Sequence, residues 1–107
     1  MLFSHIILLK KIEKAEKDMK TRKKPYGSAN VVGKNVERLR KMQHISQKSF
    51  VAMLQVQGCD VNPTSYSKLE GQIRVVTDKE LFFIAKALGL PMEALFPEDF
   101  DHKSSNN

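Results

Sequence analysis

Cysteine is scarce in this chain of 107 residues, which has a single one, Cys59. One cysteine forms no disulfide within the chain, and a metal site built from clustered cysteines is excluded. The histidines, His5, His44 and His102, are scattered and show no metal-ligand spacing. We therefore expect no disulfide, no metal and no cofactor, and the lone thiol fits a reducing compartment such as the cytoplasm.

Long apolar runs are also missing. The apolar start, Met1–Leu9, is far shorter than the roughly 20 residues that a membrane span needs. It also lacks the basic start and the small-residue cleavage site of a secretory signal. Five glycines and four prolines are too few for a disordered or fibrous chain, and a hydrophobic fraction of 41% suits a globular domain. We expect one folded domain and no membrane contact.

The sequence also lacks a recognisable arrangement of catalytic residues. The sequence has no evident pair of carboxylates for acid–base work, no nucleophile–base pair and no phosphate-cradling glycine loop. We therefore predict that the protein is not an enzyme.

Positive charge, by contrast, is plentiful: the net charge is +6 and the pI about 9.6. Residues 10–24 hold eight Lys or Arg against three Asp or Glu, and residues 31–92 hold nine against five. Residues 93–101 carry four acids and no base. A basic excess suits an anionic partner such as nucleic acid or a membrane surface, without proving one.

Composition divides the chain into three zones. Residues 1–30 form an N-terminal extension whose second part is a basic linker, residues 31–97 form the folded domain, and residues 98–107 form a polar tail. The first 18 residues are compatible with a weak amphipathic helix. Met19 is a natural start, which gives the hypothesis that residues 1–18 are an upstream extension; an intact mass counted from Met1 would contradict it.

The folded domain reads as consecutive helices, and no alternating run predicts a sheet. Ser46 is an N-cap signal, Asn62-Pro63 is an N-cap followed by proline at the first helical position, and Thr77 with Glu80 forms a capping box. Gly89 is a stop signal. The resulting prediction is an all-α fold of five helices, at residues 33–43, 47–57, 63–70, 78–88 and 91–96.

The third predicted helix, residues 63–70, carries the functional signal. Its spacing buries Tyr66 and Leu69 on one face and turns small polar residues and one lysine outward. Small side chains allow a helix to approach base edges in the major groove of DNA, where hydroxyls donate or accept hydrogen bonds. The free N–H groups at a helix N-terminus also favour phosphate. The outward residues are Pro63, Thr64, Ser67 and Lys68.

Five segments in order resemble the Cro/lambda-repressor-like (Xre-type) helix-turn-helix regulators. They are NVERLRK, ISQKSF, NPTSYSKLEGQ, VTDKELFFIAKALGL and PMEALF, and they span roughly 64 of the 107 residues, from Gly33 to Phe96. The resemblance implies the five-helix lambda-repressor-like fold, here with a basic N-terminal extension.

The resemblance also implies roles for individual residues. Gln47 matches a position that contacts backbone phosphate and buttresses the reading helix, and Arg74 matches a phosphate-gripping loop position. Arg40 and Glu70 match a structural ion pair between the first and third helices. The implied DNA-binding residues are Gln47, Asn62, Pro63, Thr64, Ser65, Ser67, Lys68 and Arg74.

Two departures from the family pattern concern the turn and the packing. Between Gln47 and Asn62 the chain is about five residues longer than the shortest members, so a longer helix and the loop Gly58–Val61 replace the tight turn. The sequence therefore predicts the identity of the DNA-reading helix more firmly than it predicts the angle of that helix. Val51 stands where the family prefers alanine, which predicts slightly wider packing of the second and third helices.

The functional expectation is a sequence-specific, double-stranded DNA-binding transcriptional regulator, a repressor, acting as a homodimer on a pseudo-palindromic operator. The resemblance implies dimerisation near the last helix, with Met92, Leu95 and Phe96 as candidates. The alternative is an antitoxin-like or adaptor protein that uses the same fold to bind an unknown protein partner.

Plainer interpretations stand beside several of these assignments. Hydroxyls at Thr64 and Ser65 also favour the first turn of a helix, and Lys68 also suits a solvated surface. Tyr66 is interpreted as core, because it shares a face with Leu69. The basic stretch 20–24 either lies along a DNA groove or is a solvated linker. A lone cysteine in a loop is usually inert, so a redox role for Cys59 is the less favoured reading.

Overall fold

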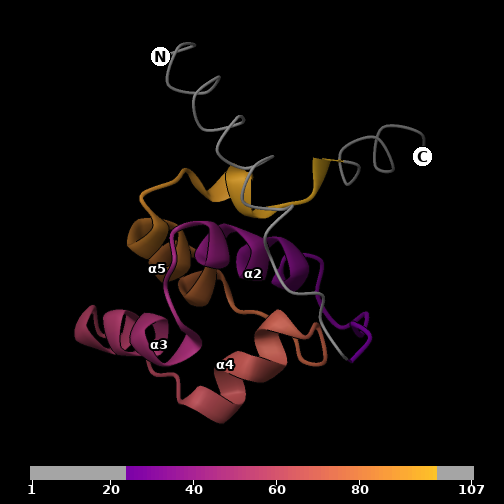
Figure 1. Ribbon diagram of the computed structural model, residues 1–107, viewed down its shortest axis with the longest axis horizontal. Helices are drawn as coiled ribbons and strands as arrows, with labels where there is room; N and C mark the ends of the chain where they lie inside the picture. Colours follow the sequence, from indigo (N-terminus) through magenta and orange to yellow (C-terminus); the bar gives the residue numbers. More distant parts are fainter. Residues whose placement is uncertain (1–23, 99–107) are drawn as a thin grey trace.

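The computed structural model describes residues 24–98, and the chain there is helical (Figure 1). The elements are α2 (Gly33–Met42), α3 (Gln47–Val56), α4 (Pro63–Glu70), α5 (Asp78–Leu88) and the 3-10 helix η1 (Met92–Leu95). No strand occurs within residues 24–98, so the predicted all-α class is confirmed. The five-helix count is wrong for this part of the chain, which has four α-helices and one 3-10 helix.

The helix ends follow local signals in the sequence. The Ser46 side chain accepts a hydrogen bond from the backbone N–H of Ser49, and Asn62 caps α4 in the same way. Thr77 and Glu80 form both halves of the predicted capping box of α5. Gly89 ends that helix with a φ of 71°, in the left-handed region that a residue without Cβ adopts readily. Helices α4 and α5 therefore have the predicted bounds.

The last predicted helix, residues 91–96, is the one that the structure corrects. Pro91 and Phe96 are both extended, which leaves only the four residues of η1 to turn between them. The Ala94 N–H donates to the Pro91 carbonyl at 3.0 Å, which is the i→i+3 bond of a 3-10 helix. The segment is too short for a ladder of α-helical bonds, and the burial of Leu95 holds the tighter turn in place.

The core lies between two groups of helices that meet at α2. In Figure 1, α3 and α4 lie below α2, α5 lies at the left end of α2 and partly behind it, and the yellow η1 lies above it. The rings of Phe50 from α3 and Tyr66 from α4 pack with centroids 5.6 Å apart. The largest fully buried side chains are Tyr66, Phe50, Leu54, Leu69, Ile84, Leu95, Glu70 and Val36. Tyr66 is therefore core, as its helical spacing predicts.

The segment Tyr26–Asn30, which we call the N-terminal strap, packs against the turn after α4. The Gly27 N–H donates to the Gly71 carbonyl and the Ala29 N–H to the Gln72 carbonyl, both at 2.8 Å. The folded domain thus begins several residues before the predicted boundary at residue 31. The expectations for residues 1–23, and those for the tail after residue 98, lie outside the described residues.

No helix of the described part is long and apolar enough to cross a membrane.

Candidate nucleic-acid interface

Helix α4 presents one polar face to solvent. Thr64, Ser67 and Lys68 are exposed, whereas Tyr66 and Leu69 are fully buried. In Figure 1 the helix lies along the lower edge of the molecule, opposite η1. The structure therefore gathers the predicted outward residues on one face of one short helix.

The N-terminus of α4 is held by its cap. The Asn62 side-chain oxygen accepts from the Ser65 N–H at 2.8 Å, and Pro63 occupies the first turn, where no amide donor is needed. Asn62 and Pro63 are exposed, and Ser65 is half-buried. The Asn62 oxygen thus stabilises the helix, which leaves its amide nitrogen to face solvent or a ligand.

Behind α4, the carboxylate of Glu70 is paired with Arg40 of α2. The Nε and Nη2 atoms of Arg40 donate to the two carboxylate oxygens at 2.6 and 3.0 Å, and Nη1 donates to the Ile45 carbonyl at 2.6 Å. The side chains are 6% and 0% exposed, so this bidentate pair is buried, and the expected ion pair is confirmed. Burial lowers the pKa of Arg40, but the hydrogen bond and the charge of Glu70 outweigh it and leave that pKa raised.

Two further donors complete the environment of Glu70. The Tyr66 hydroxyl donates to one oxygen at 2.5 Å, and the Gln47 side-chain amide donates to the other at 2.8 Å. Burial and the adjacent carboxylate both raise the pKa of Tyr66, so its hydroxyl remains a donor. One carboxylate on α4 therefore receives hydrogen bonds from α2, α3 and α4, and we call these four side chains the Glu70 network.

Gln47 has one of the two roles that the resemblance implies for it. It opens α3 and is half-buried, and its amide nitrogen holds Glu70. The side chain thus braces α4 from α3. Its contact with phosphate stays a prediction.

Arg74 is engaged inside the protein. Its Nη1 and Nη2 atoms donate to the carboxylate oxygens of Glu80 at 2.9 and 2.6 Å, and its Nε donates to the Ser65 carbonyl at 2.8 Å. Nη1 also donates to the Val75 carbonyl. These bonds use most of the five donors of the guanidinium, so the geometry favours a structural role over a grip on phosphate.

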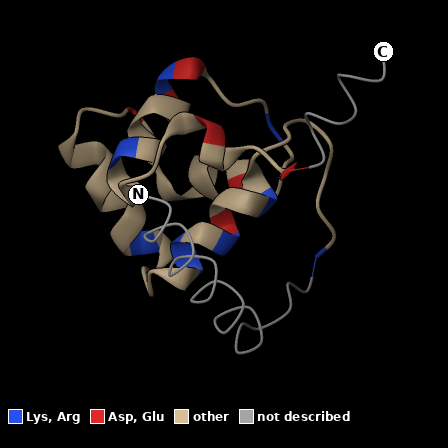
Figure 2. Cartoon of the chain, turned by 90° about the horizontal axis from the view of Figure 1, so that it is seen from above, with Lys and Arg blue, Asp and Glu red and all other residues tan. Residues whose placement is uncertain are grey.

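The surface charge alone does not mark a binding face. Basic and acidic residues are interspersed over the described helices (Figure 2). Lys68 on α4 and Lys48 in the first turn of α3 are both exposed. Lys48 is absent from the predicted site, although it directly follows the predicted site residue Gln47 in the first turn of α3.

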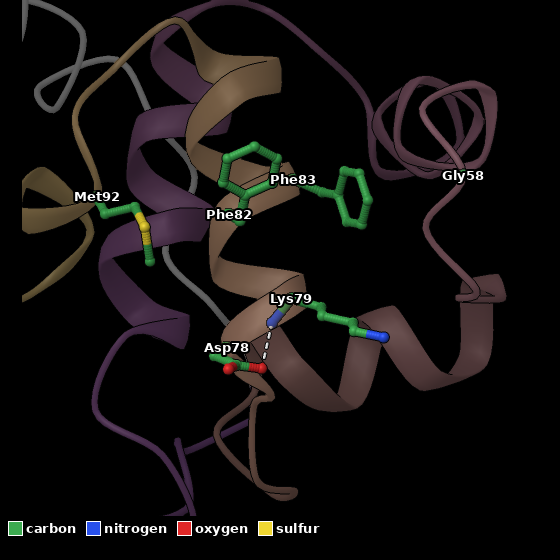
Figure 3. A pocket seen from close by; sticks show the side chains of 6 residues that line it. All are labelled: Gly58, Asp78, Lys79, Phe82, Phe83 and Met92. Carbon is green, nitrogen blue, oxygen red and sulfur yellow. Dashed lines mark hydrogen bonds between the residues drawn. The ribbon is translucent and has the colours of Figure 1, made fainter.

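An apolar groove lies between the end of α3, the start of α5 and η1, and none of its described lining residues belongs to α4 (Figure 3). Its volume is about 470 Å³, and Phe82 and Met92 on its wall are 52% and 39% exposed. Leu95, a predicted dimer contact, is instead fully buried in the core of its own chain, which removes it as a surface contact. Phe82 is not among the predicted contact residues, because the resemblance placed dimerisation near the last helix.

Metal and redox chemistry find no support in the described part. Within residues 24–98 no three histidine, cysteine or acidic side chains come together to hold a metal ion. Cys59 is buried, and burial, followed by the charges of Glu80 and Asp60, raises the pKa of its thiol. A raised pKa disfavours the reactive thiolate, which agrees with the inert interpretation.

Comparison with protein-family models, with curated proteins and with solved structures found no match for the chain.

Proposed function

We propose that the protein is a sequence-specific, double-stranded DNA-binding transcriptional regulator that inserts α4 into the major groove. The observation that carries this proposal is the contrast between the two faces of α4. The inner face is fixed by the Glu70 network and the core, and the outer face offers one proline, short polar side chains and one lysine. This function implies a compartment that contains DNA, namely the cytoplasm expected from the sequence.

The dimensions of α4 suit the major groove. An α-helix with its side chains is about 10–12 Å across, and the major groove of B-DNA is about 12 Å wide. Short side chains at Thr64 and Ser67 let the helix axis come close to the base edges. In this proposal those hydroxyls and Lys68 contact bases or neighbouring phosphates, and the N-terminal end with Asn62 and Pro63 faces the backbone.

The family resemblance belongs to the same proposal. The order of α2, α3, a loop, α4 and α5 matches the order of the five resembling segments. The connection between Val56 and Pro63 is long, which is the predicted departure from the tight turn of the motif. The chain is thus proposed to have the lambda-repressor-like fold of Xre-type regulators, with a 3-10 helix in the place of the last α-helix.

A homodimer is the proposed binding form. A single DNA-binding module buries only about 600–1,000 Å² of protein surface, and a two-fold dimer doubles the contact on half-sites about 34–36 Å apart. Phe82 and Met92 offer an exposed apolar contact in a groove that no described residue of α4 lines, so a dimer formed there is proposed to leave both reading helices open. This pair replaces Leu95 in the proposed interface.

The test compares two exposed lysines that each lie in the last turn of a helix, Lys68 of α4 and Lys86 of α5. We expect Lys68→Ala to weaken binding to a labelled duplex by about tenfold, which corresponds to about 1.4 kcal/mol and falls within the range of one base or phosphate contact. The Lys86→Ala control should bind as the parent does. Neither variant should change the melting temperature measurably, because both side chains are solvated.

The duplex is best obtained by selecting bound sequences from a random pool. A recovered two-fold motif would support the dimer and the reading role together. Equal affinity of the parent and Lys68→Ala would contradict the site. No binding of the parent to any duplex at low salt would contradict DNA binding itself, and would favour the protein-binding alternative.

A further inference from the structure

The start of α2 lies directly against the end of α4 (Figure 1). A Cβ added to Gly33 would lie 2.2 Å from the Leu69 carbonyl oxygen and 2.7 Å from the Glu70 carbonyl oxygen, distances that real Cβ atoms essentially never show. Gly33 is the first residue of α2, and Glu70 is the last residue of α4. Only a residue without Cβ therefore fits at this crossing, where one helix backbone lies against the other.

Asn30 joins the same two helix ends with both ends of its side chain. Its amide nitrogen donates to the carbonyls of Leu69 and Arg74, at 3.0 and 2.9 Å. Its amide oxygen accepts from the N–H groups of Val32 and Gly33, at 3.0 and 2.8 Å. One side chain thus binds a carbonyl in the last turn of α4 and free N–H groups at the start of α2.

Gln72, in the turn after α4, makes a second connection. Its side-chain oxygen accepts from the N–H of Lys34 in the first turn of α2 at 3.1 Å, and its side-chain nitrogen donates to the Asn30 carbonyl at 2.5 Å. Val32, the N-cap residue of α2, makes no side-chain cap bond, so Asn30 and Gln72 cap this helix instead. We call Asn30, Gly33 and Gln72 the α2–α4 junction.

The contacts behind α4 constrain its direction less strictly than this junction does. Arg40 and Glu70 meet through two long side chains, which can follow a small rotation of either helix by small changes in their side-chain torsions. The contact at Gly33 has no such freedom, because both of its sides are helix backbone. The junction is therefore the most rigid attachment of the C-terminal end of α4.

The N-terminal end of α4 follows a long connection and not a tight turn. Residues 57–62 separate α3 from α4, and Asn62 and Pro63 at the start of α4 are exposed. Val61 in this connection is buried, and its carbonyl accepts from the Gln55 side chain at 2.8 Å. That contact anchors the connection to α3, whereas the junction holds residues of α4 itself.

We propose that the α2–α4 junction sets the angle at which α4 enters the major groove, which makes Asn30, Gly33 and Gln72 positioning residues for the reading of bases. This inference rests on the proposed function. Where a tight turn is absent, the direction of the helix has to be fixed from its other end. Hydrogen bonds to base edges need a strict geometry, whereas phosphate contacts carry no sequence information. The junction should therefore control sequence-specific binding and leave non-specific binding unchanged.

The test compares two asparagines that each tie α2 to another element. Asn30→Ala removes the junction bonds, and Asn35→Ala removes a half-buried amide that donates to the Ala94 carbonyl of η1 at 2.8 Å. We expect Asn30→Ala to bind a duplex selected from a random pool about tenfold more weakly, the effect of one lost base contact, and to keep its affinity for a mixed-sequence duplex. Asn35→Ala should bind both duplexes as the parent does. Circular dichroism at the assay temperature ensures that folded proteins are compared.

Gln72→Gly is a second variant that should stay folded. Gln72 has a φ of 58°, which glycine adopts without strain, so the substitution removes the side chain and keeps the turn. We expect the same loss of preference for the selected duplex as in Asn30→Ala. Residual dipolar couplings of the backbone N–H groups give the angle between α4 and α5 in the free protein. That angle should change in Asn30→Ala and Gln72→Gly and stay parental in Asn35→Ala.

The outcomes separate this inference from the proposed function. A parental preference for the selected duplex in both Gln72→Gly and folded Asn30→Ala would overturn the inference and leave α4 as the reading helix. An equal loss of preference in Asn35→Ala would overturn it as well. If Asn30→Ala is unfolded, Gln72→Gly alone decides. A parent that prefers no duplex would overturn the proposed function, and the inference with it.

Discussion

Two arginine–glutamate pairs flank the proposed reading helix, and they differ in burial. Arg40–Glu70 ties α2 to the end of α4, with side chains 6% and 0% exposed. Arg74–Glu80 ties the following loop to α5, with side chains 22% and 12% exposed. Both are bidentate, so geometry alone does not separate them. The comparison teaches that the buried pair positions α4 as part of the core, whereas water competes for the second pair.

Removal of Arg40 gives the largest expected effect. Arg40→Ala should lower the free energy of unfolding by about 3–5 kcal/mol, because the Glu70 carboxylate is left buried without its charge partner. Denaturant unfolding measures this, with the exposed Lys48→Ala as a control that should stay within about 0.5 kcal/mol of the parent. A loss as small as that of the control would mean that the buried pair contributes no more than a surface pair.

Tyr66→Phe tests how far the same carboxylate depends on its neutral donors. The substitution keeps the ring against Phe50 and removes the hydroxyl that donates to Glu70, so we expect a loss of about 1.5–3 kcal/mol. Tyr26→Phe is the matched control, because its hydroxyl donates to Glu37 in a half-buried place and should matter less. A greater loss in free energy of unfolding for Tyr26→Phe than for Tyr66→Phe would contradict this expectation.

Glu80→Gln weakens the more exposed pair and makes it sensitive to pH. Burial raises the pKa of the Glu80 carboxyl, but hydrogen bonds from Arg74 and Thr77 outweigh it, so the pKa lies below its usual 4.5. A lowered pKa means stability that is present above pH 4.5 and is lost as pH falls through the lower value in the folded state. The loss in Glu80→Gln should be about 1–2 kcal/mol near pH 7 and shrink in acid. Denaturant unfolding between pH 7 and pH 3 follows it, and a loss that stays constant with pH would contradict the assignment.

The smallest expected effect is the influence of salt on the stability loss of each variant, which should differ between the two pairs. At about 1 M salt the Debye length is about 3 Å, so the loss measured for Glu80→Gln should fall by a few tenths of a kcal/mol. The loss measured for Arg40→Ala should not change, because the buried pair is shielded from ions. Denaturant unfolding of both variants at low and high salt provides the measurement. Equal salt effects on both variants would contradict the difference in burial between the two pairs.

Local signals account for what the sequence predicted well. Helices α4 and α5 have the predicted ends because Asn62, Pro63, Thr77 and Gly89 act within one turn of the helix that they start or stop. The outer face of α4 was also predictable, since helical spacing alone separates it from Tyr66 and Leu69.

Long-range contacts account for the rest. The strap has linker composition, and its order comes from Asn30, whose partners Leu69 and Arg74 lie about 40 residues away in sequence. Arg74 sits in a loop where phosphate contact was expected; its partner Glu80 is only six residues away, but the contact depends on how this loop turns into α5. The last helix was misjudged because its apolar residues fit an α-helix, while Pro91 and the burial of Leu95 allow only one tight turn.

The Glu70 network has a consequence for retargeting. Because α4 is held entirely from behind, Thr64, Ser67 and Lys68 are free of packing constraints. A library randomised at these three positions should retain the fold in most members while varying the face that is proposed to meet the major groove of DNA. The proposed recognition surface could then be changed without altering the packing of the rest of the domain.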